Sequence, residues 1–337
     1  MVGTRRRARL VAGTVALALT VAACSSGGSS ASSTSTTRPP RPTTTTTTAA
    51  PTTTTLPPVP WAAVPSGPAR VVITPTGVVV PVQRAVDATH WVGSSPCGAT
   101  VTVTGTPIAG ANVVLDPGHG GNETGAVGPA GTTEKAVNLA VAQDVQRDLE
   151  ARGAKVVLTR TGDERVTLAT RAAISNALHP QVFLSIHHNA EADGPSPRPG
   201  TETYYQITSP ASKRLAGLVW EEVVAALTPY KVAWVADRDA GAKYRPASDG
   251  GDYYGVLRRT AGTPAVLSEL AFLTNPPEEA LLRQPAVQEV EAAALARAII
   301  RFVSTDDPGS GFVTPYPRTE PAGPGGGAQG CVDPPLG

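Results

Sequence analysis

Two histidines and a glutamate stand at positions where a sheet protein could bind a catalytic metal ion. His119 follows the apolar stretch 113–115, Glu134 opens a helical pattern, and His187 ends the apolar stretch 181–187. The carboxyl ends of parallel strands meet at one edge of a sheet, which is where open α/β sheets bind their ligands. Two imidazoles and one carboxylate, with a fourth position open, are the ligand set of a catalytic zinc site. The sequence therefore predicts one zinc ion per chain, bound by His119, Glu134 and His187.

A second glutamate lies where it could act on water at such a site. Glu269 ends the apolar stretch 265–269. A carboxylate among buried apolar residues is costly unless it is paired or functional. Beside a metal ion it is the natural general base for a proton of zinc-bound water. We therefore predict that Glu269 is the catalytic residue.

Two of these residues have a simpler structural interpretation. Pro117 and the glycines around His119 are typical of a strand-end turn that happens to hold a histidine. Glu134 could serve only as a favourable negative charge in the first turn of a helix. Because His119, Glu134, His187 and Glu269 all stand at positions that suit one catalytic site, we favour the catalytic interpretation.

The other histidines and Arg171 are not assigned to the site. Adjacent strand residues point to opposite sides, so His188 is not expected to bind the metal together with His187. His179 precedes a proline and is typical of a helix end, and His90 belongs to a β-rich stretch nearer the N-terminus. Arg171 lies in a helical pattern, where it is either a surface charge or part of a buried pair.

Alternating strand and helix patterns from residue 111 to residue 303 must position these side chains. Apolar stretches predict strands at 113–115, 155–159, 181–187 and 264–270, and an alternating stretch predicts an edge strand at 201–206. Amphipathic patterns predict helices at 134–152, 168–178, 212–227 and 285–303, with an irregular surface loop over 228–259. This order is typical of an α/β fold with a mostly parallel twisted sheet flanked by helices on both faces.

A small N-terminal β unit precedes this domain, and a Gly/Pro-rich tail follows it. Residues 69–107 hold three or four short extended stretches, the first two joined as a hairpin by the turn 74–77. A unit of this size is too small to be confidently stable alone, so we expect it to pack on the main domain. A separate binding module is the alternative. The tail comprises residues 304–337.

The first 23 residues have the pattern of a bacterial lipoprotein signal peptide. Arginines within 5–9 precede a short apolar stretch at 10–22, and small residues lead directly to Cys24. An ordinary secretory signal with a chance cysteine is the alternative. Residues 24–68 begin with a long run of Ser, Thr, Pro and Ala, which cannot bury enough apolar surface to become ordered. We expect an exported protein, lipid-anchored through Cys24 to the outer face of the cytoplasmic membrane by way of a disordered linker.

Two cysteines, Cys97 and Cys331, remain once Cys24 carries lipid. An exported location permits disulfides, so we predict that these two cysteines pair and tie the tail to the β unit. Two free thiols, or a bond to a cysteine of a partner protein, are the alternatives.

Four motifs together resemble one enzyme family. They are Asp116-Pro117-Gly118-His119-Gly120-Gly121, Glu134-Lys135 followed by Asn138-Leu139, Ser185-Ile186-His187, and Glu269-Leu270-Ala271-Phe272-Leu273-Thr274-Asn275. In this order, through about residues 112–302, they resemble the zinc-dependent N-acetylmuramoyl-L-alanine amidases of the Amidase_3 family, in an actinobacterial-type lipoprotein form. The resemblance implies zinc on His119, Glu134 and His187, catalysis by Glu269, and cleavage of the amide bond between N-acetylmuramic acid and L-alanine of peptidoglycan stem peptides.

The chain departs from the family pattern at two positions outside the predicted chemistry. Ala271 stands where the family usually has glycine, and His188 stands where it often has alanine. No long helical insertion of the kind that covers the site in some relatives is evident in the sequence. The resemblance therefore leaves open how the enzyme is regulated and whether an activator protein acts on it.

Other functions fit the sequence less well. A net charge of +1, with no basic stripe beyond the N-terminus, argues against nucleic acid as a partner. A zinc exopeptidase or another amide hydrolase of the same architecture is one alternative, although related sites often need bridging carboxylates that the motifs do not supply. A non-catalytic peptidoglycan-binding or activator protein would have lost a ligand or Glu269, and all four residues are present. We expect peptidoglycan, and the membrane through the lipid anchor, to be the partners.

Overall fold

The computed structural model describes residues 58–317 and 326–337. The predicted signal peptide, Cys24 and most of the linker lie outside these residues. The described residues all belong to one compact unit, residues 56–337. No helix within the described ranges is long and apolar enough to cross a membrane.

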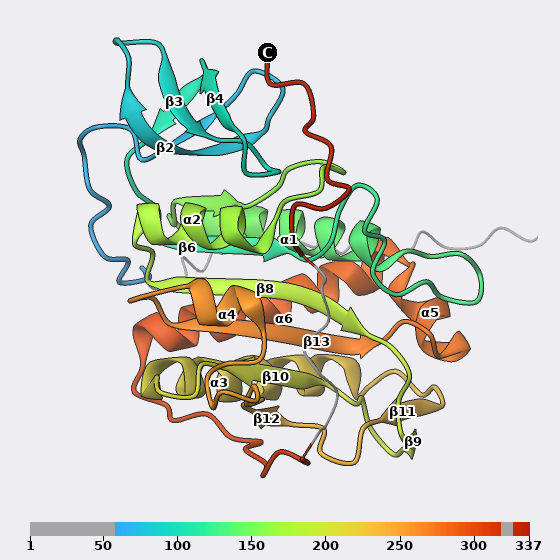
Figure 1. Ribbon diagram of the computed structural model, residues 1–337. Helices are drawn as coiled ribbons and strands as arrows, with labels where there is room; N and C mark the ends of the chain where they lie inside the picture. Colours follow the sequence, from blue (N-terminus) through green and yellow to red (C-terminus); the bar gives the residue numbers. More distant parts are fainter. Residues whose placement is uncertain (1–57, 318–325) are drawn as a thin grey trace, which may run out of the picture. The chain divides into compact units, whose positions relative to one another are not determined.

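A six-stranded sheet forms the centre of this unit (Figure 1). Its strands, in spatial order, are β12 (Ala242–Lys243), β10 (Glu202–Tyr205), β13 (Ala265–Phe272), β8 (Val182–Asn189), β6 (Val113–Pro117) and β7 (Val156–Leu158). All neighbouring strands are parallel except β10 and β13, which pair antiparallel. The central strands are buried on both faces, as expected for a parallel sheet covered by helices.

Helices cover both faces of this sheet. One face packs on α1 (Glu134–Glu150), α3 (Pro210–Leu227) and α6 (Pro285–Ser304), and the other packs on α2 (Leu168–Leu178) and α4 (Gly255–Arg259). Strand β6 shows why two cores form, because Val113 and Leu115 join the first cluster and Val114 joins the second. These observations confirm the predicted mostly parallel α/β fold.

The β unit has five strands, one more than the upper count expected. They are β1 (Val71–Ile73), β2 (Val79–Ala85), β3 (Trp91–Ser94), β4 (Thr100–Val103) and β5 (Thr106–Ile108), in the order β4-β3-β2-β1-β5. The predicted hairpin joins β1 to β2. Strand β5 escaped prediction because it has only three residues and contains Pro107. Val71 and Val79 belong to the same core cluster as residues of α2, so the unit packs on this helix.

Two predictions about the later part of the domain are wrong. The stretch 201–206 is not an edge strand, because β10 is buried and pairs on one side with β13 and on the other with β12. The region 228–259 is not simply a surface loop. It contributes the edge strand β12, the helix α4, and β11 (Trp234–Ala236), which pairs with β9 (Gly194–Ser196). A further short helix, α5 (Pro276–Leu282), follows β13 and was not predicted.

The C-terminal segment, residues 326–337, is bound to the β unit. Cys97 and Cys331 form a disulfide, with their Cα atoms 5.6 Å apart. Asp333 adds two hydrogen bonds, accepting from the Cys97 amide at 2.8 Å and from the Ser95 hydroxyl at 2.7 Å. This end of the chain is therefore part of the folded unit.

Candidate active site

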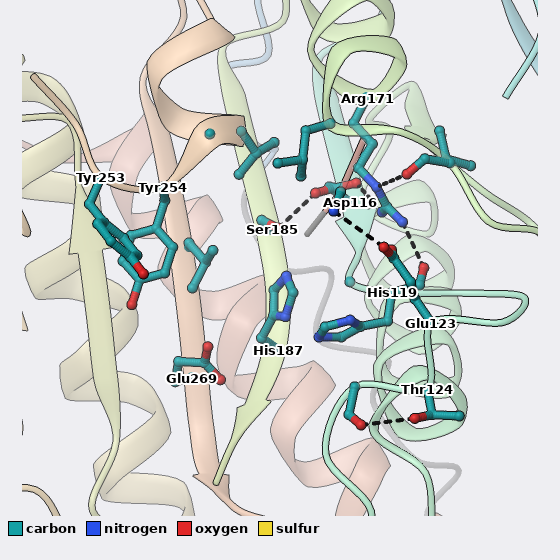
Figure 2. A pocket seen from close by; sticks show the side chains of 18 of the residues that line it. Asp116, His119, Glu123, Thr124, Arg171, Ser185, His187, Tyr253, Tyr254 and Glu269 are labelled. Atoms are coloured by element: carbon teal, nitrogen blue, oxygen red, sulfur yellow. Dashed lines mark hydrogen bonds and ion pairs between the residues drawn. The ribbon is translucent and has the colours of Figure 1, made fainter. Parts of the chain in front are cut away.

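The site lies where three parallel strands end at one edge of the sheet. In the register of the sheet, Glu269 on β13 pairs with His187 on β8, and Pro117 at the end of β6 pairs with Ile186. His119 follows two residues after Pro117, and its backbone takes a left-handed conformation with φ of 61°. Figure 2 shows that His187 and His119 point toward one another, while Glu269 faces the same cavity from the neighbouring strand.

The structure brings together the three predicted metal ligands. His119 Nε2 lies 3.1 Å from Glu134 Oε2, and His187 Nδ1 lies 3.0 Å from Glu134 Oε1. One donor atom from each of the three residues lies within 4.8 Å of the others. The two imidazole rings meet edge to face, with centroids 5.0 Å apart. Two imidazole nitrogens and a carboxylate at this spacing fit zinc and leave room for a further ligand.

Glycines allow the ligands to approach this closely. A Cβ on Gly118 would lie 2.2 Å from His187 Cε1, and a Cβ on Gly125 would lie 2.3 Å from Glu134 Oε2. Gly125 also has φ of +66°, which other residues rarely adopt. The glycine-rich turns around the histidine are therefore needed to assemble the site.

Glu134 is fixed by several donors besides the histidines. Its Oε2 accepts from the Ala126 amide at 2.8 Å, and its Oε1 accepts from Asn138 Nδ2 and the His188 amide, each at 3.2 Å. Burial opposes a charge on this carboxylate, but hydrogen bonds with the two imidazoles outweigh burial and hold the pKa of Glu134 well below its usual value. A carboxylate that stays ionised and oriented is suited to bind a metal ion.

Burial also favours the metal-binding form of His187. Burial lowers the pKa of His187, and the hydrogen bond with Glu134 and the charge of that residue offset this only in part. The neutral imidazole, with a free nitrogen lone pair, is the form that binds metals.

His188 points away from the site, as strand alternation predicts. Its Nδ1 lies 2.8 Å from Asn138 Oδ1 and its Nε2 lies 3.4 Å from Glu291 Oε2, all within the protein interior. Because Asn138 also donates to Glu134, the side chain of His188 supports the site through that amide, while its backbone amide donates to Glu134 directly.

Arg171, which we left outside the site, in fact holds the turn that carries His119. It is buried, and its guanidinium donates to Asp116 Oδ1, to the Pro117 carbonyl and to the His119 carbonyl, each at 2.6 Å. Asp116 also accepts from Thr159 and Ser185. Burial opposes its charge, but Arg171 and these hydroxyls keep the pKa of Asp116 below its usual value. Figure 2 shows this ion pair directly beside the two histidines.

Replacing Arg171 should destabilise the protein strongly. We expect Arg171→Met to lower the free energy of unfolding by about 3–5 kcal/mol, because it leaves the charge of Asp116 buried and unpaired. Arg297→Met is a matched control: this arginine is half-exposed and pairs with Glu222 at 2.8 Å, so the loss should be about 0–1 kcal/mol. Chemical denaturation measures both. Equal denaturation midpoints for the two variants would contradict the role of Arg171.

Glu269 lies on the strand beside His187, and one of its oxygens has no hydrogen-bond partner among the described residues. This oxygen, Oε2, is buried. Burial, and then the negative charges of Glu134, Glu202 and Asp237, raise the pKa of Glu269 well above its usual value. A carboxylate with a free oxygen and a raised affinity for protons is suited to accept a proton from water and to return it.

A second carboxylate cluster nearby already contains a positive charge. Glu202, Asp237 and Asp239 bring one oxygen each within 4.8 Å of the others. The buried ammonium of Lys243 forms ion pairs with Glu202 and with Asp239, the latter at 2.7 Å. An ammonium inside the cluster does not favour it as the second metal site that a dinuclear exopeptidase would need.

The site opens into a cavity of about 650 Å³, which we call the cleft. It extends from Tyr253 and Tyr254 across His187 and Glu269 to the loop at Glu123 (Figure 2). Neither tyrosine was predicted as a site residue, because an irregular stretch rich in Tyr and Gly carries no periodicity that would orient its side chains.

Known proteins resemble this chain over the same domain. A family profile described as N-acetylmuramoyl-L-alanine amidase (Amidase_3) matches residues 113–301. The uncharacterized protein YqiI of Bacillus subtilis is 34% identical over 216 residues, which cover 62% of this chain and 95% of that protein. The amidase LytC of the same organism is 35% identical over 215 residues, covering 63% of this chain and 40% of LytC.

A solved structure shares the fold. Cwp6 from Clostridium difficile matches with a TM-score of 0.51 and 31% identity, over 58% of this chain and 30% of Cwp6. This chain thus spans less than half the length of LytC and of Cwp6. The sheet brings the motifs to one edge, and the family profile matches more than half of the chain. The chain therefore belongs to the Amidase_3 family of N-acetylmuramoyl-L-alanine amidases.

Proposed function

We propose that the protein is a zinc-dependent hydrolase that cleaves the amide bond between N-acetylmuramic acid and L-alanine in peptidoglycan. One observation carries the proposal: His119, Glu134 and His187 converge at the sheet edge, with the unpaired carboxylate oxygen of Glu269 facing the same cleft. Membership of the amidase family supplies the substrate class. In this account the three convergent residues hold one zinc ion, and Glu269 is the catalytic residue.

We assign the following roles to the zinc ion and to the residues of the site. Zinc, when bound, polarises the amide carbonyl and makes water a stronger acid. Glu269 accepts the proton of the attacking water on its free oxygen and donates it to the nitrogen of the leaving L-alanine. Arg171 and Asp116 keep His119 in place, and the cleft orients the substrate.

Cleavage products give the direct test of this function. We expect the purified protein, incubated with N-acetylmuramoyl peptides, to release peptides that begin with L-alanine and sugars that end in an intact N-acetylmuramic acid. Mass spectrometry distinguishes these products from all others. Release of terminal amino acids from the stem peptide would instead support an exopeptidase, and absence of cleavage by zinc-loaded protein would contradict the proposal.

We also propose that the enzyme works outside the cytoplasmic membrane, tethered by lipid on Cys24. The pattern of a lipoprotein signal supports this, as does the name of a relative, the probable cell wall amidase LytH of Staphylococcus aureus, which is 31% identical over 200 residues. The disulfide in the β unit is consistent with an oxidising compartment.

The anchor can be tested by changing one residue. Cys24→Ala should move the protein from the membrane fraction to the soluble fraction, because it removes the thiol that would carry the lipid. Activity on soluble muropeptides should be unchanged, since Cys24 is not among the residues proposed to bind zinc or to move protons. Ser25→Ala, one position further on, should fractionate like the parent. If Cys24→Ala also stays with the membranes, the anchor hypothesis is wrong.

A further inference from the structure

The C-terminal segment reaches the rim of the cleft. Gly326 is among the residues that line the cleft, beside Glu123 and Leu168. Its amide donates to Glu123 Oε1 at 3.2 Å, and its carbonyl accepts from the Leu168 amide at 2.9 Å. Residues distant in sequence from the metal ligands thus complete one side of the site.

The residues after Gly326 are bound to the same rim. Arg165 donates to the Gly327 and Gln329 carbonyls, both at 2.9 Å, and Asn122 donates to the Gly330 carbonyl at 2.8 Å. Arg165 also pairs with Glu123 at 2.6 Å. The run 326–330 therefore lies against two segments, the loop that follows His119 and the residues that lead into α2, and is held mainly through its own backbone carbonyls.

A covalent bond fixes the position of this run. Cys331 follows immediately and is joined to Cys97 in the β unit. Backbone carbonyls alone give weak anchorage to a glycine-rich stretch, because ordering glycine has a high entropic cost. The disulfide lowers that cost by keeping the segment close to the rim when its hydrogen bonds break.

We propose that the run 326–330, which lines the cleft through Gly326, forms a wall of the substrate cleft and that the Cys97–Cys331 disulfide holds this wall against the bound muropeptide. The segment lies outside residues 113–301, which match the family. The inference rests on the proposed function, because it identifies the cleft as the place where the muropeptide binds. Its consequence is that loss of the disulfide weakens substrate binding and leaves the metal site intact.

Two sets of substitutions displace the wall in different ways. Cys97→Ser with Cys331→Ser releases the segment. Gly326→Ala keeps the disulfide, but its Cβ would lie 2.3 Å from Leu168 Cγ and must push the wall away from that side chain. Gly153→Ala, at the end of α1 and away from the cleft, is the matched control: its φ of +84° carries a similar backbone strain to the +78° of Gly326, but its Cβ would meet nothing within 4 Å.

The experiment measures binding separately from turnover. A soluble N-acetylmuramoyl tetrapeptide is titrated by calorimetry into zinc-loaded protein carrying Glu269→Gln, with and without each change, and KM, kcat and zinc content are measured with Glu269 present. Loss of one or two contacts should raise Kd and KM about five- to tenfold. We expect this rise in both wall variants, with kcat and zinc content at parental values and Gly153→Ala like the parent. Measurements are made well below the unfolding temperature of the double serine variant.

Other outcomes overturn the inference. If Kd and KM are unchanged or fall in the wall variants, the segment is not a substrate wall. If zinc content and kcat fall together, the segment supports the metal loop instead. If the proposed function is wrong, the unmodified protein will not cleave the muropeptide. If the protein also fails to bind the muropeptide, both proposals are contradicted.

Discussion

Replacing Glu269 with glutamine should abolish most turnover while the protein keeps its metal ion. Glutamine preserves the shape of the side chain but cannot accept a proton from water. Because general acid–base catalysis contributes about 10²–10⁴-fold, kcat should fall by at least about 10²-fold. Zinc content should stay near one per chain, since Glu269 is not among the three convergent ligands. Elemental analysis and turnover of a muropeptide measure the two quantities on the same sample.

A buried glutamate outside the cleft provides the control for this experiment. Glu278 accepts from the Phe272 amide at 2.7 Å and does not line the cleft, so Glu278→Gln removes a similar charge near the end of the same strand. Its kcat should remain close to the parental value in folded, zinc-loaded protein. A Glu269→Gln protein with full zinc and near-parental turnover would show that another group moves the proton, and the region 228–259 would then be searched for it.

Replacing His187 with alanine should remove zinc and activity together. It deletes one of the three proposed ligands and removes the imidazole that lies 3.0 Å from Glu134 Oε1. Loss of a residue that merely supports a ligand already lowers metal affinity by about 10–100-fold, so loss of a ligand should lower it further. Zinc affinity by competition with a chelator is the measurement, with activity followed in parallel.

The control for this experiment is a variant that loses an exposed histidine which is not a proposed metal ligand. His90 lies in the β unit, where its ring pairs with Asp87 at 3.0 Å, so His90→Ala should keep parental zinc affinity and activity. If His187→Ala binds zinc as tightly as His90→Ala does, His187 is not a ligand.

The parts of the fold and of the site that could be predicted depend on local patterns in the sequence. Apolar stretches and helical periodicity gave the strands and helices of the main domain, including α2 at its observed bounds. The convergence of His119, His187 and Glu269 follows from topology, because parallel strands expose their carboxyl ends at one edge. Strand alternation also separated His187 from its neighbour.

The features that could not be predicted depend on contacts between residues that are distant in the sequence. The role of Arg171 depends on carbonyls at Pro117 and His119, more than fifty positions away, and a helical pattern does not show whether an arginine faces such a turn. Lys243 was assigned to a loop because a two-residue strand leaves no periodic signal, yet it is buried against Glu202. Gly326 reaches the cleft from a glycine-rich stretch whose composition indicates only flexibility.

Anomalous diffraction at the zinc edge, on crystals of the protein purified with zinc, tests the central claim most directly. The account predicts one peak per chain, bonded to one nitrogen each of His119 and His187 and to the carboxylate of Glu134, with ligand distances of about 2.0–2.2 Å. A peak at Glu202, Asp237 and Asp239, alone or as a second site, would contradict a single-metal amidase centre, as would crystals without zinc at the triad.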